Sequence, residues 1–340
     1  MQDCKSLLGI FSLGVLSWTH VWAVDLPGPV VDTQWLARNQ TDVQIIDIRS
    51  DTESFTTQPE VGIDEKTGDR QVSRIGGHIA NSLAVDYPSV RSEKLVDGQT
   101  IKYLVPEATR FETLMQQAGV DSGKPMVIVS SGVNAKAVDE GLRLYWQLKY
   151  FGEDQVSVLD GGFAAWIADG HEVSVEPGLN RTGNWKARSL HPELAATPDE
   201  IAQRDASVQL IDARSTAQHY GFSKKDYVYA YGHIQDSKSV PPDVLYRQDG
   251  SAVKFYSPDA YRTILAISGV DINQPAIVYC NSGHMAAGPW FIEHELMGNS
   301  RTRLFDGSMH QWTVEKRPVV SVSMAPMPQT CSAGVQSPGC

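Results

Sequence analysis

Residues 276–291 read AIVYCNSGHMAAGPWF, an apolar run that ends on a cysteine and continues into a short glycine-containing loop and a helical segment. In an α/β sheet, ligands lie at the carboxyl ends of the strands, where a loop leads into a helix. Backbone N–H groups of the loop and the positive end of the helix favour an anion there, so they favour a thiolate and would also stabilise a persulfide. Gly283 lets the backbone curl tightly around the sulfur. The stretch therefore predicts a reactive Cys280 held by a loop of Asn281, Ser282, Gly283, His284 and Met285.

Two chemistries use a cysteine in such an anion-binding loop. A cysteine-dependent phosphatase needs an arginine six residues after the cysteine to hold the phosphate oxygens, and this chain has Ala286 at that position. Sulfur transfer needs only the thiolate and the loop. The sequence therefore favours sulfur transfer at Cys280.

Four blocks of sequence occur twice in the same order, which indicates a duplicated domain. The pairs are IIDIRS (45–50) with LIDARS (210–215), GGHIANS (76–82) with YGHIQDS (231–237), MVIVSSG (126–132) with AIVYCNSG (276–283), and VSVLDGGFAAW (156–166) with TRLFDGSMHQW (302–312). The repeats of a solenoid are much shorter. Two successive domains of similar fold are expected.

Each half alternates short apolar runs with helical segments, a pattern typical of an α/β domain with a mostly parallel sheet flanked by helices. The runs lack polar alternation, as buried parallel strands do, and cover residues 43–48, 127–130, 156–159, 208–211, 276–279 and 303–305. The sequences TPDE (197–200) and SPDA (257–260) place a Ser or Thr cap before a proline, so each predicts a helix start.

The first 23 residues resemble a secretory signal. Lys5 supplies a positive charge, residues 7–18 an apolar segment too short to span a bilayer comfortably, and residues 21–23 a small-residue exit. We expect cleavage after Ala23 and export to a periplasmic or extracellular space, with no membrane attachment after cleavage. The formal charge of −11 argues against non-specific binding to nucleic acid.

The four cysteines then have three different expected fates. Cys4 leaves with the signal, and Cys331 and Cys340 close a short Gly/Pro/Ser segment in which we expect a disulfide. Cys280 remains unpaired, which calls for an explanation in an exported protein. A buried cysteine that acts as a small apolar residue is the alternative explanation.

The spacing C-x-x-G-x-x-A at Cys280, together with LIDAR, GHI and DGSMHQW in order, resembles the tandem-domain rhodanese family of thiosulfate and 3-mercaptopyruvate sulfurtransferases. The resemblance implies two rhodanese-like domains: a catalytically silent one at 28–172, with Ser131 in the position of the cysteine, and a catalytic one at 196–320. Between them we expect a linker at 173–195, and after them a tail at 321–340. The resemblance also implies that Cys280 cycles between thiol and persulfide and that no cofactor is required.

The donor is less sharply defined by the sequence. Thiosulfate is favoured, because an arginine that would hold the carboxylate of mercaptopyruvate is replaced by Gln218, with Lys224 and Lys225 further on. Ser282 and His78 match the mercaptopyruvate-using members, so 3-mercaptopyruvate and polysulfide stay open as donors. The acceptor would be a thiol, cyanide or a protein. A persulfide carrier without turnover is the alternative function.

Several site residues also have a structural interpretation. Arg214 could contact substrate, yet an Asp212–Arg214 pair that braces neighbouring loops explains it better, since Asp47 and Arg49 repeat the motif. His78, His284 and Lys225 are further candidates for substrate contact. No histidine or cysteine pattern predicts a metal site. Pro289 is expected to kink the helix that follows the loop.

Overall fold

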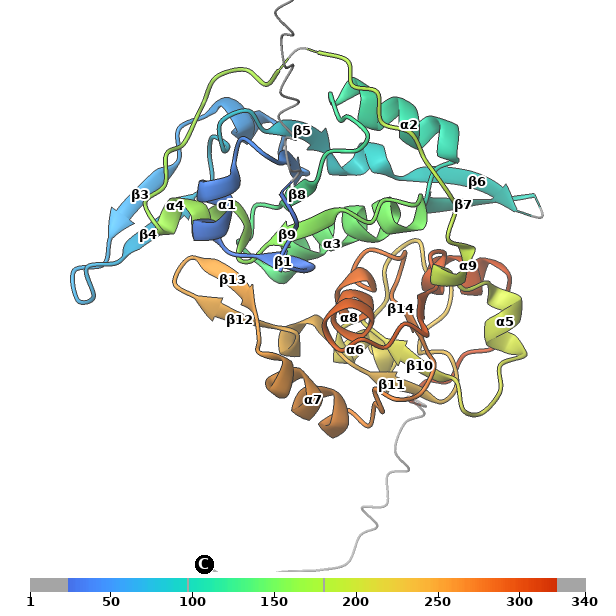
Figure 1. The fold of residues 1–340 in the computed structure, drawn as a ribbon. Coiled ribbons are helices and arrows are strands. Elements are labelled where there is room, and N and C mark those ends of the chain that lie inside the picture. The colour runs from blue at the N-terminus through green and yellow to red at the C-terminus, as the bar shows by residue number, and fades with distance from the viewer. Residues whose placement is uncertain (1–23, 97, 180, 323–340) are drawn as a thin grey trace, which may run out of the picture.

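The computed structural model describes residues 24–96, 98–179 and 181–322. The predicted signal, the tail beyond residue 322 and its cysteines Cys331 and Cys340 lie outside the described residues. Two parallel sheets form the core of the chain, one in each half, as Figure 1 shows. The predicted α/β class with two tandem domains is confirmed.

The first-half sheet has the strand order β1-β9-β8-β2-β5, and the second-half sheet has the order β11-β10-β14-β15. Ala195 adds a parallel bridge to Leu304 at the β15 edge, in the place that β1 occupies beside β9. All pairs within these sheets are parallel. The strands are β1 (Val30–Val31), β2 (Gln44–Arg49), β5 (Leu83–Asp86), β8 (Met126–Val129), β9 (Val156–Leu159), β10 (Gln209–Asp212), β11 (Ser237–Ser239), β14 (Ala276–Tyr279) and β15 (Thr302–Leu304). Each predicted apolar run lies on one of these strands within a residue or two.

The helices begin where the sequence places caps. Thr197 and Glu200 form a capping box at α5, and Ser257 caps α7, so both predicted starts are confirmed. The α-helices are α1 (Thr33–Asn39), α2 (Ala108–Gln117), α3 (Ala135–Tyr150), α4 (Gly162–Ala168), α5 (Pro198–Ala202), α6 (Thr216–His219), α7 (Pro258–Ile267), α8 (Ala287–Phe291) and α9 (Ser308–Val314). Single turns lie at η1 (Glu53–Thr56), η2 (Tyr87–Val90), η3 (Pro192–Leu194) and η4 (Pro242–Val244), and a π-helical turn, η5 (Ile292–Leu296), extends α8.

The sequence predicts a kink at Pro289, and the structure places this proline at the start of its helix. α8 begins at Ala287, so Pro289 lies in the first turn. The N–H groups of a first turn have no partner within the helix, so a residue that lacks one is tolerated there.

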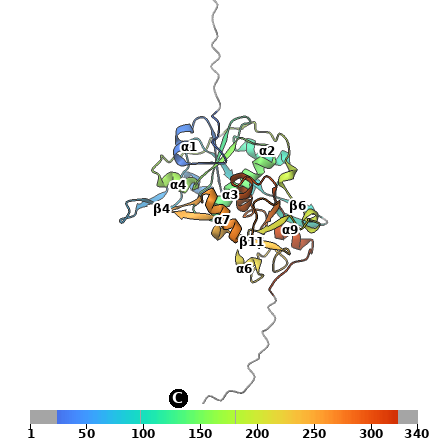
Figure 2. The same ribbon diagram turned by 60° about the horizontal axis from the view of Figure 1, so that its bottom comes forward.

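Each half extends a β-hairpin toward the other half (Figures 1 and 2). The hairpin β6 (Ser92–Val96) with β7 (Gln99–Leu104) packs on α9, and β12 (Tyr246–Asp249) with β13 (Ala252–Phe255) packs on α4. A third hairpin, β3 (Glu60–Ile63) with β4 (Arg70–Arg74), extends from the first half. At the ends of the exchanged hairpins, the N–H of Val105 donates to Asp306 and the N–H of Phe255 donates to Asp160. The two halves therefore hold one another through equivalent contacts.

The helices α3 and α8 pack against each other between the sheets. Tyr145 of α3 meets Phe291 of α8 edge to face at 4.9 Å, and both belong to one apolar core that includes residues of both halves. The predicted linker is a strap across the first half, in which Trp185 is buried against Phe111. The two halves thus share one apolar core and are not packed as separate units.

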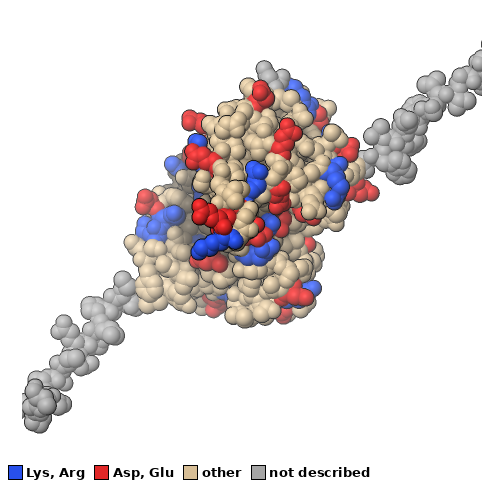
Figure 3. Space-filling view, turned by 90° about the vertical axis from the view of Figure 1, so that its left-hand side faces the viewer, with Lys and Arg blue, Asp and Glu red and all other residues tan. Residues whose placement is uncertain are grey.

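Basic and acidic side chains are intermixed on the face that carries the β3–β4 hairpin, as Figure 3 shows. Among the residues that the structure describes, no helix is both long and apolar enough to cross a membrane.

Burial raises the pKa of Glu293, in the π-helical turn, to about 7 from a reference of 4.5. Because the folded state holds the proton more tightly than the unfolded state, stability from this group is full below pH 4.5 and is lost as the pH rises to about 7. We expect wild type to lose on the order of 3 kcal/mol relative to Glu293→Gln across this window. Urea unfolding at a series of pH values measures this difference in the free energy of unfolding, and Glu176→Gln, at an exposed position, is the control. Parallel pH profiles for wild type and Glu293→Gln would contradict the assignment.

Candidate active site

Cys280 follows directly after β14, which lies between β10 and β15 in the second sheet. Its side chain is 2% exposed and its thiol is free. The residue is therefore at the carboxyl end of a central strand, where the topology of an α/β sheet places ligands.

The backbone turns sharply at Gly283, which has a φ of +71°. A Cβ atom there would lie 2.6 Å from the carbonyl oxygen of Asp306 and 2.8 Å from Nη1 of Arg143. Only glycine fits this position, because both the conformation and the space exclude a side chain. The tight curl of the loop depends on it.

Ser308 joins the two ends of this curl. Its hydroxyl accepts hydrogen bonds from the N–H groups of Cys280 and Gly283, at 3.0 Å each, and donates to the carbonyl of Phe305 at 2.8 Å. The same oxygen lies 4.0 Å from the sulfur of Cys280. Ser308 adopts a φ of +50°, and the first half has Gly162 at the equivalent place with a φ of +56°. The sequence marks this serine only by the change from DGG to DGS between the two repeats, and Ser308 was not among the predicted site residues.

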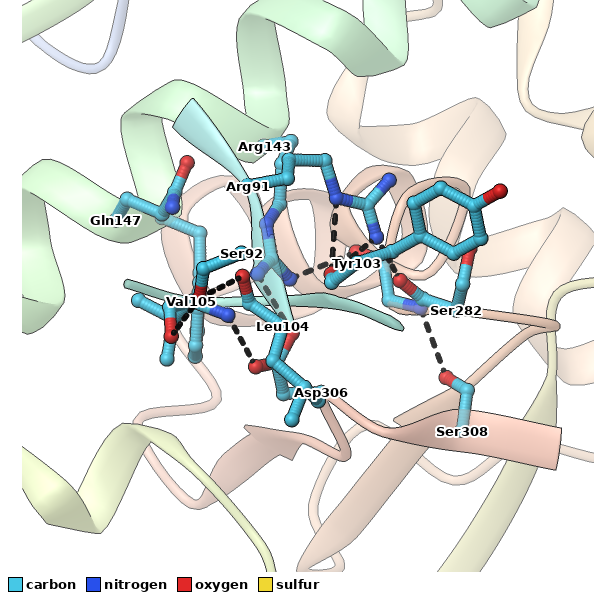
Figure 4. A network of polar contacts seen from close by, with 12 residues as sticks. Arg91, Ser92, Tyr103, Leu104, Val105, Arg143, Gln147, Ser282, Asp306 and Ser308 are labelled. Carbon is cyan, nitrogen blue, oxygen red and sulfur yellow. Dashed lines mark hydrogen bonds and ion pairs between the residues drawn. The ribbon is translucent and has the colours of Figure 1, made fainter. Parts of the chain in front are cut away.

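Two arginines of the first half hold the carbonyl groups of the loop (Figure 4). Arg91 donates to the carbonyl of Ser282, and Arg143 donates to that of Gly283 at 3.0 Å. The carbonyl and the N–H of a trans peptide unit point in opposite directions. With those carbonyls directed at the arginines, the N–H groups of Gly283 and His284 are turned to the opposite side, and the N–H of Gly283 reaches Ser308.

Arg143 is fully buried and forms an ion pair with Asp306 at 2.6 Å. Arg91 is 9% exposed, and its guanidinium also donates to Tyr87 and to the carbonyl of Tyr103. Neither arginine could be predicted from the sequence, because both lie far from Cys280 along the chain and no local motif marks them.

The predicted loop residues are held on several sides. Asn281 donates to the side chain of Gln218 at 2.9 Å, and the hydroxyl of Tyr227 contacts the side chain of Ser282. Burial raises the pKa of Tyr227. Met285 packs against the shared core. Gln218 replaces the carboxylate-binding arginine of the mercaptopyruvate-using members, and its side chain is hydrogen-bonded to the loop.

His284 faces the first half. Its ring packs against Tyr87 with the centroids 4.7 Å apart and the planes tilted by 41°, and its Nε2 lies 3.2 Å from the carbonyl oxygen of Lys136. Burial and the charge of Arg91 hold the pKa of His284 well below its usual value. At neutral pH the imidazole is therefore uncharged and adds no positive charge to the loop.

The structure places the other predicted substrate contacts as follows. Arg214 is buried, forms a two-point contact with Asp212 and donates to the carbonyl of Gly232. Arg49 makes the same contacts with Asp47 and Gly77 in the first half, which matches the bracing interpretation.

His78 is 2% exposed, stacks on Phe55, and its Nδ1 lies 2.9 Å from the carbonyl oxygen of Phe55. Lys225 is exposed on the segment after α6. Neither residue is joined to Cys280 by a hydrogen bond within the described chain.

The residue equivalent to Cys280 in the first half is Ser130, not Ser131 as the sequence alignment predicted. Asp212 pairs with Tyr279 and Asp47 pairs with Val129, so the strands end in the same register just before Cys280 and Ser130. The carbonyl of each then accepts from the equivalent helix, at Met309 and Phe163. Alignment on the shared glycine misplaced the position because the first-half loop is shorter.

Within residues 24–96, 98–179 and 181–322, no three His, Cys, Asp or Glu side chains gather as they would around a metal ion.

Comparison with known proteins places both halves in one family. A family profile described as "Rhodanese-like domain" matches residues 32–169 and 197–315. The thiosulfate sulfurtransferase of Cricetulus griseus is 28% identical over 228 residues, which cover 65% of this chain and 73% of that one. A protein of Saccharopolyspora erythraea provisionally given the same name is 26% identical over 244 residues, 70% of this chain and 81% of its own.

Two solved structures share the fold. A 3-mercaptopyruvate sulfotransferase from Escherichia coli superposes with a TM-score of 0.66 at 24% identity, over 83% of this chain and 98% of its own. An anaerobic ergothioneine biosynthesis enzyme from Chlorobium limicola superposes with a TM-score of 0.67 at 17% identity, over 86% of this chain and 70% of its own. At these identities the likeness establishes the architecture alone.

Removal of the Arg143 guanidinium would leave Asp306 buried without its ion partner and the carbonyl of Gly283 without its donor. We expect Arg143→Met to lower the free energy of unfolding by about 3–5 kcal/mol. Arg262→Gln, which breaks an exposed pair with Asp259, is the matched control and should cost less than about 1 kcal/mol. Denaturant titration of both variants gives the comparison. Equal losses for the two would mean that Arg143 is not structurally required.

Two variants separate the effect of the positive φ at Ser308 on stability from the effect of its hydroxyl. Ser308→Ala leaves two buried N–H groups without an acceptor and keeps the positive φ, so we expect a loss of about 1–3 kcal/mol. Ser308→Gly loses the same acceptor but fits the backbone, and should be about 1–2 kcal/mol more stable than the alanine variant. Denaturant titration tests the order wild type, glycine, alanine. An alanine variant as stable as wild type would rule out the bridging role.

Proposed function

The chain belongs to the rhodanese-like family, and we propose that it is a sulfurtransferase in which Cys280 carries a sulfane sulfur from thiosulfate to a thiophilic acceptor. The observation that supports this most directly is the environment of Cys280: a free, buried thiol at a strand end, inside a loop whose carbonyls are held outward by Arg91 and Arg143. Such a loop presents its N–H groups to an anion. A thiolate and a persulfide are both anions, so the N–H groups of this loop would stabilise either one.

The reaction divides into two displacements. The Cys280 thiolate attacks the outer sulfur of thiosulfate, the S–S bond of thiosulfate breaks, and sulfite leaves with the electron pair. The terminal sulfur of the new persulfide is negatively charged and is stabilised by the loop N–H groups. A thiolate or cyanide then attacks that sulfur, and the Cys280 thiolate is the leaving group. A covalent intermediate of this kind gives ping-pong kinetics.

Thiosulfate is the proposed donor because the groups around the loop do not form a carboxylate clamp. Gln218 is an amide bonded to Asn281, His284 is uncharged, and the guanidinium of Arg214 is engaged by Asp212. A planar carboxylate is bound best by two parallel donors of a guanidinium. Ser282 favours 3-mercaptopyruvate as a second candidate donor, since its hydroxyl lies beside Tyr227 where it could contact a keto acid.

Export is part of the proposal. The basic and apolar pattern of residues 1–23 supports a signal, and the closely spaced Cys331 and Cys340 support a tail disulfide in an oxidising compartment. The division into domains at 28–172 and 196–320, with the join at 173–195, also remains a proposal. The sulfur acceptor in the cell would be a thiol or a partner protein.

Intact mass after incubation with thiosulfate tests the function. We expect wild type to gain the mass of one sulfur atom, cyanide to remove it, and Cys280→Ser to gain none. Ser130→Ala, at the equivalent place in the first half, is the matched control and should load fully. Loading by 3-mercaptopyruvate or polysulfide but not thiosulfate would replace the donor, and loading by none of the three would overturn the sulfurtransferase proposal.

A further inference from the structure

A cavity of about 380 Å³ lies in the first half, which carries no cysteine. It opens at the carboxyl ends of β2 and β8 and at the start of α3, with Ser50, Asp51 and Ser131 in its wall. This is the place that the Cys280 loop occupies relative to β10 and β14 in the second half. Its volume is in the range of about 300–1,000 Å³ that small-molecule sites occupy.

The difference in loop length explains why the space is open. In the second half, residues 280–286 separate β14 from α8 and curl over the strand ends. In the first half, only residues 130–134 separate β8 from α3. The shorter loop runs directly into the helix, so the volume that the longer loop fills is left free.

The inner wall carries a buried carboxylate. Glu140 is 5% exposed and lines the cavity, where it accepts a hydrogen bond from the hydroxyl of Ser50 at 2.7 Å. Lys136 lies 3.6 Å from the same oxygen of Glu140, and its side chain is 65% exposed. A buried carboxylate is costly unless donors surround it. An ammonium group inside the cavity would be a further charged donor for this carboxylate.

The rim carries two cations with exposed side chains. Arg74 lies 2.8 Å from Glu60, with 56% and 61% of the two side chains exposed, and Lys136 is 65% exposed beside the buried Glu140. The exposed pair of Arg74 contributes little stability, so this guanidinium can turn toward a ligand. An ammonium group that replaced Lys136 at Glu140 would free Lys136 to do the same. Ile75 and Val133 add an apolar stretch to the wall.

The charge balance selects the kind of ligand. Arg49 also lines the cavity, but Asp47 neutralises it. Two cations, Arg74 and Lys136, and two carboxylates, Asp51 and Glu140, also line the cavity, and of these Lys136 and Glu140 pair with each other. A simple anion such as sulfite would meet both carboxylates, whereas a molecule with separated positive and negative groups satisfies each side.

We propose that this cavity binds a small zwitterion, a free amino acid, with its ammonium group at Glu140 and its carboxylate between Arg74 and Lys136. The site is separate from Cys280 and does not depend on the sulfurtransferase proposal. It is nevertheless linked to the cysteine loop, since the carbonyl of Lys136 contacts His284, four residues after Cys280.

The test is binding to the full-length protein, without turnover. Each of the proteinogenic amino acids is added at millimolar concentration and detected by saturation-transfer NMR, followed by calorimetry on those that bind. We expect at least one to bind with a one-to-one ratio, with equal affinity for wild type and Cys280→Ser. Glu140→Gln, and separately Arg74→Gln, should weaken binding at least tenfold.

The controls keep the outcome unambiguous. Arg74→Gln alters only an exposed rim side chain, so it tests the site even if a substitution at the buried Glu140 disturbs folding. Lys136→Met also removes the ion partner of Glu140 and should weaken binding several-fold. Arg262→Gln, on α7, should change nothing. No binding by any amino acid, binding unaffected by Arg74→Gln and Lys136→Met, or binding of sodium sulfite in preference to amino acids would each overturn the proposal.

Discussion

The loop after Cys280 depends on two hydrogen bonds that the other half donates. A loop as tightly curled as this one turns successive carbonyl groups in the same general direction, and buried carbonyls need donors. Arg91 and Arg143 supply them at Ser282 and Gly283. Because the peptide unit is planar, the same contacts fix where the N–H groups point. The direction of the N–H groups after Cys280 is therefore determined by residues of the first half.

The first half receives a donor in the equivalent loop, but not from an arginine: the carbonyl of Gly132 accepts from the backbone N–H of Val253 at 2.8 Å. Asp160 and Asp306 also receive equivalent backbone N–H groups across the interface. The residue that follows η2, however, is Arg91, while the residue that follows η4 is the buried, apolar Leu245. The loop after Ser130 thus receives no guanidinium from the second half at the corresponding place. The duplication has kept the scaffold symmetric and made the charges asymmetric.

The sequence predicted those features that are encoded locally. Apolar runs without alternation predicted the parallel strands, and Ser/Thr–Pro pairs predicted the starts of α5 and α7, because both signals arise within a few residues. The position of Cys280 at a strand end followed from the same reasoning. Arg91 and Arg143 could not be found in this way, since their role arises only when the hairpin and α3 meet a loop more than 130 residues away. The assignment of Ser131 failed for a related reason: a shared glycine is a weaker marker of equivalence than strand register, which only the structure provides.

Comparison of the two repeats shows why Ser308 is a serine. A non-glycine residue in the left-handed region is costly, and the first half avoids that cost with Gly162 at the same turn. The turn itself therefore requires only glycine. A serine is useful there solely for its hydroxyl, which accepts from the N–H groups on both sides of the curl and lies 4.0 Å from the sulfur. At this turn the strain appears beside Cys280 and not in the first half, so it belongs to the surroundings of the thiol and not to the shared fold.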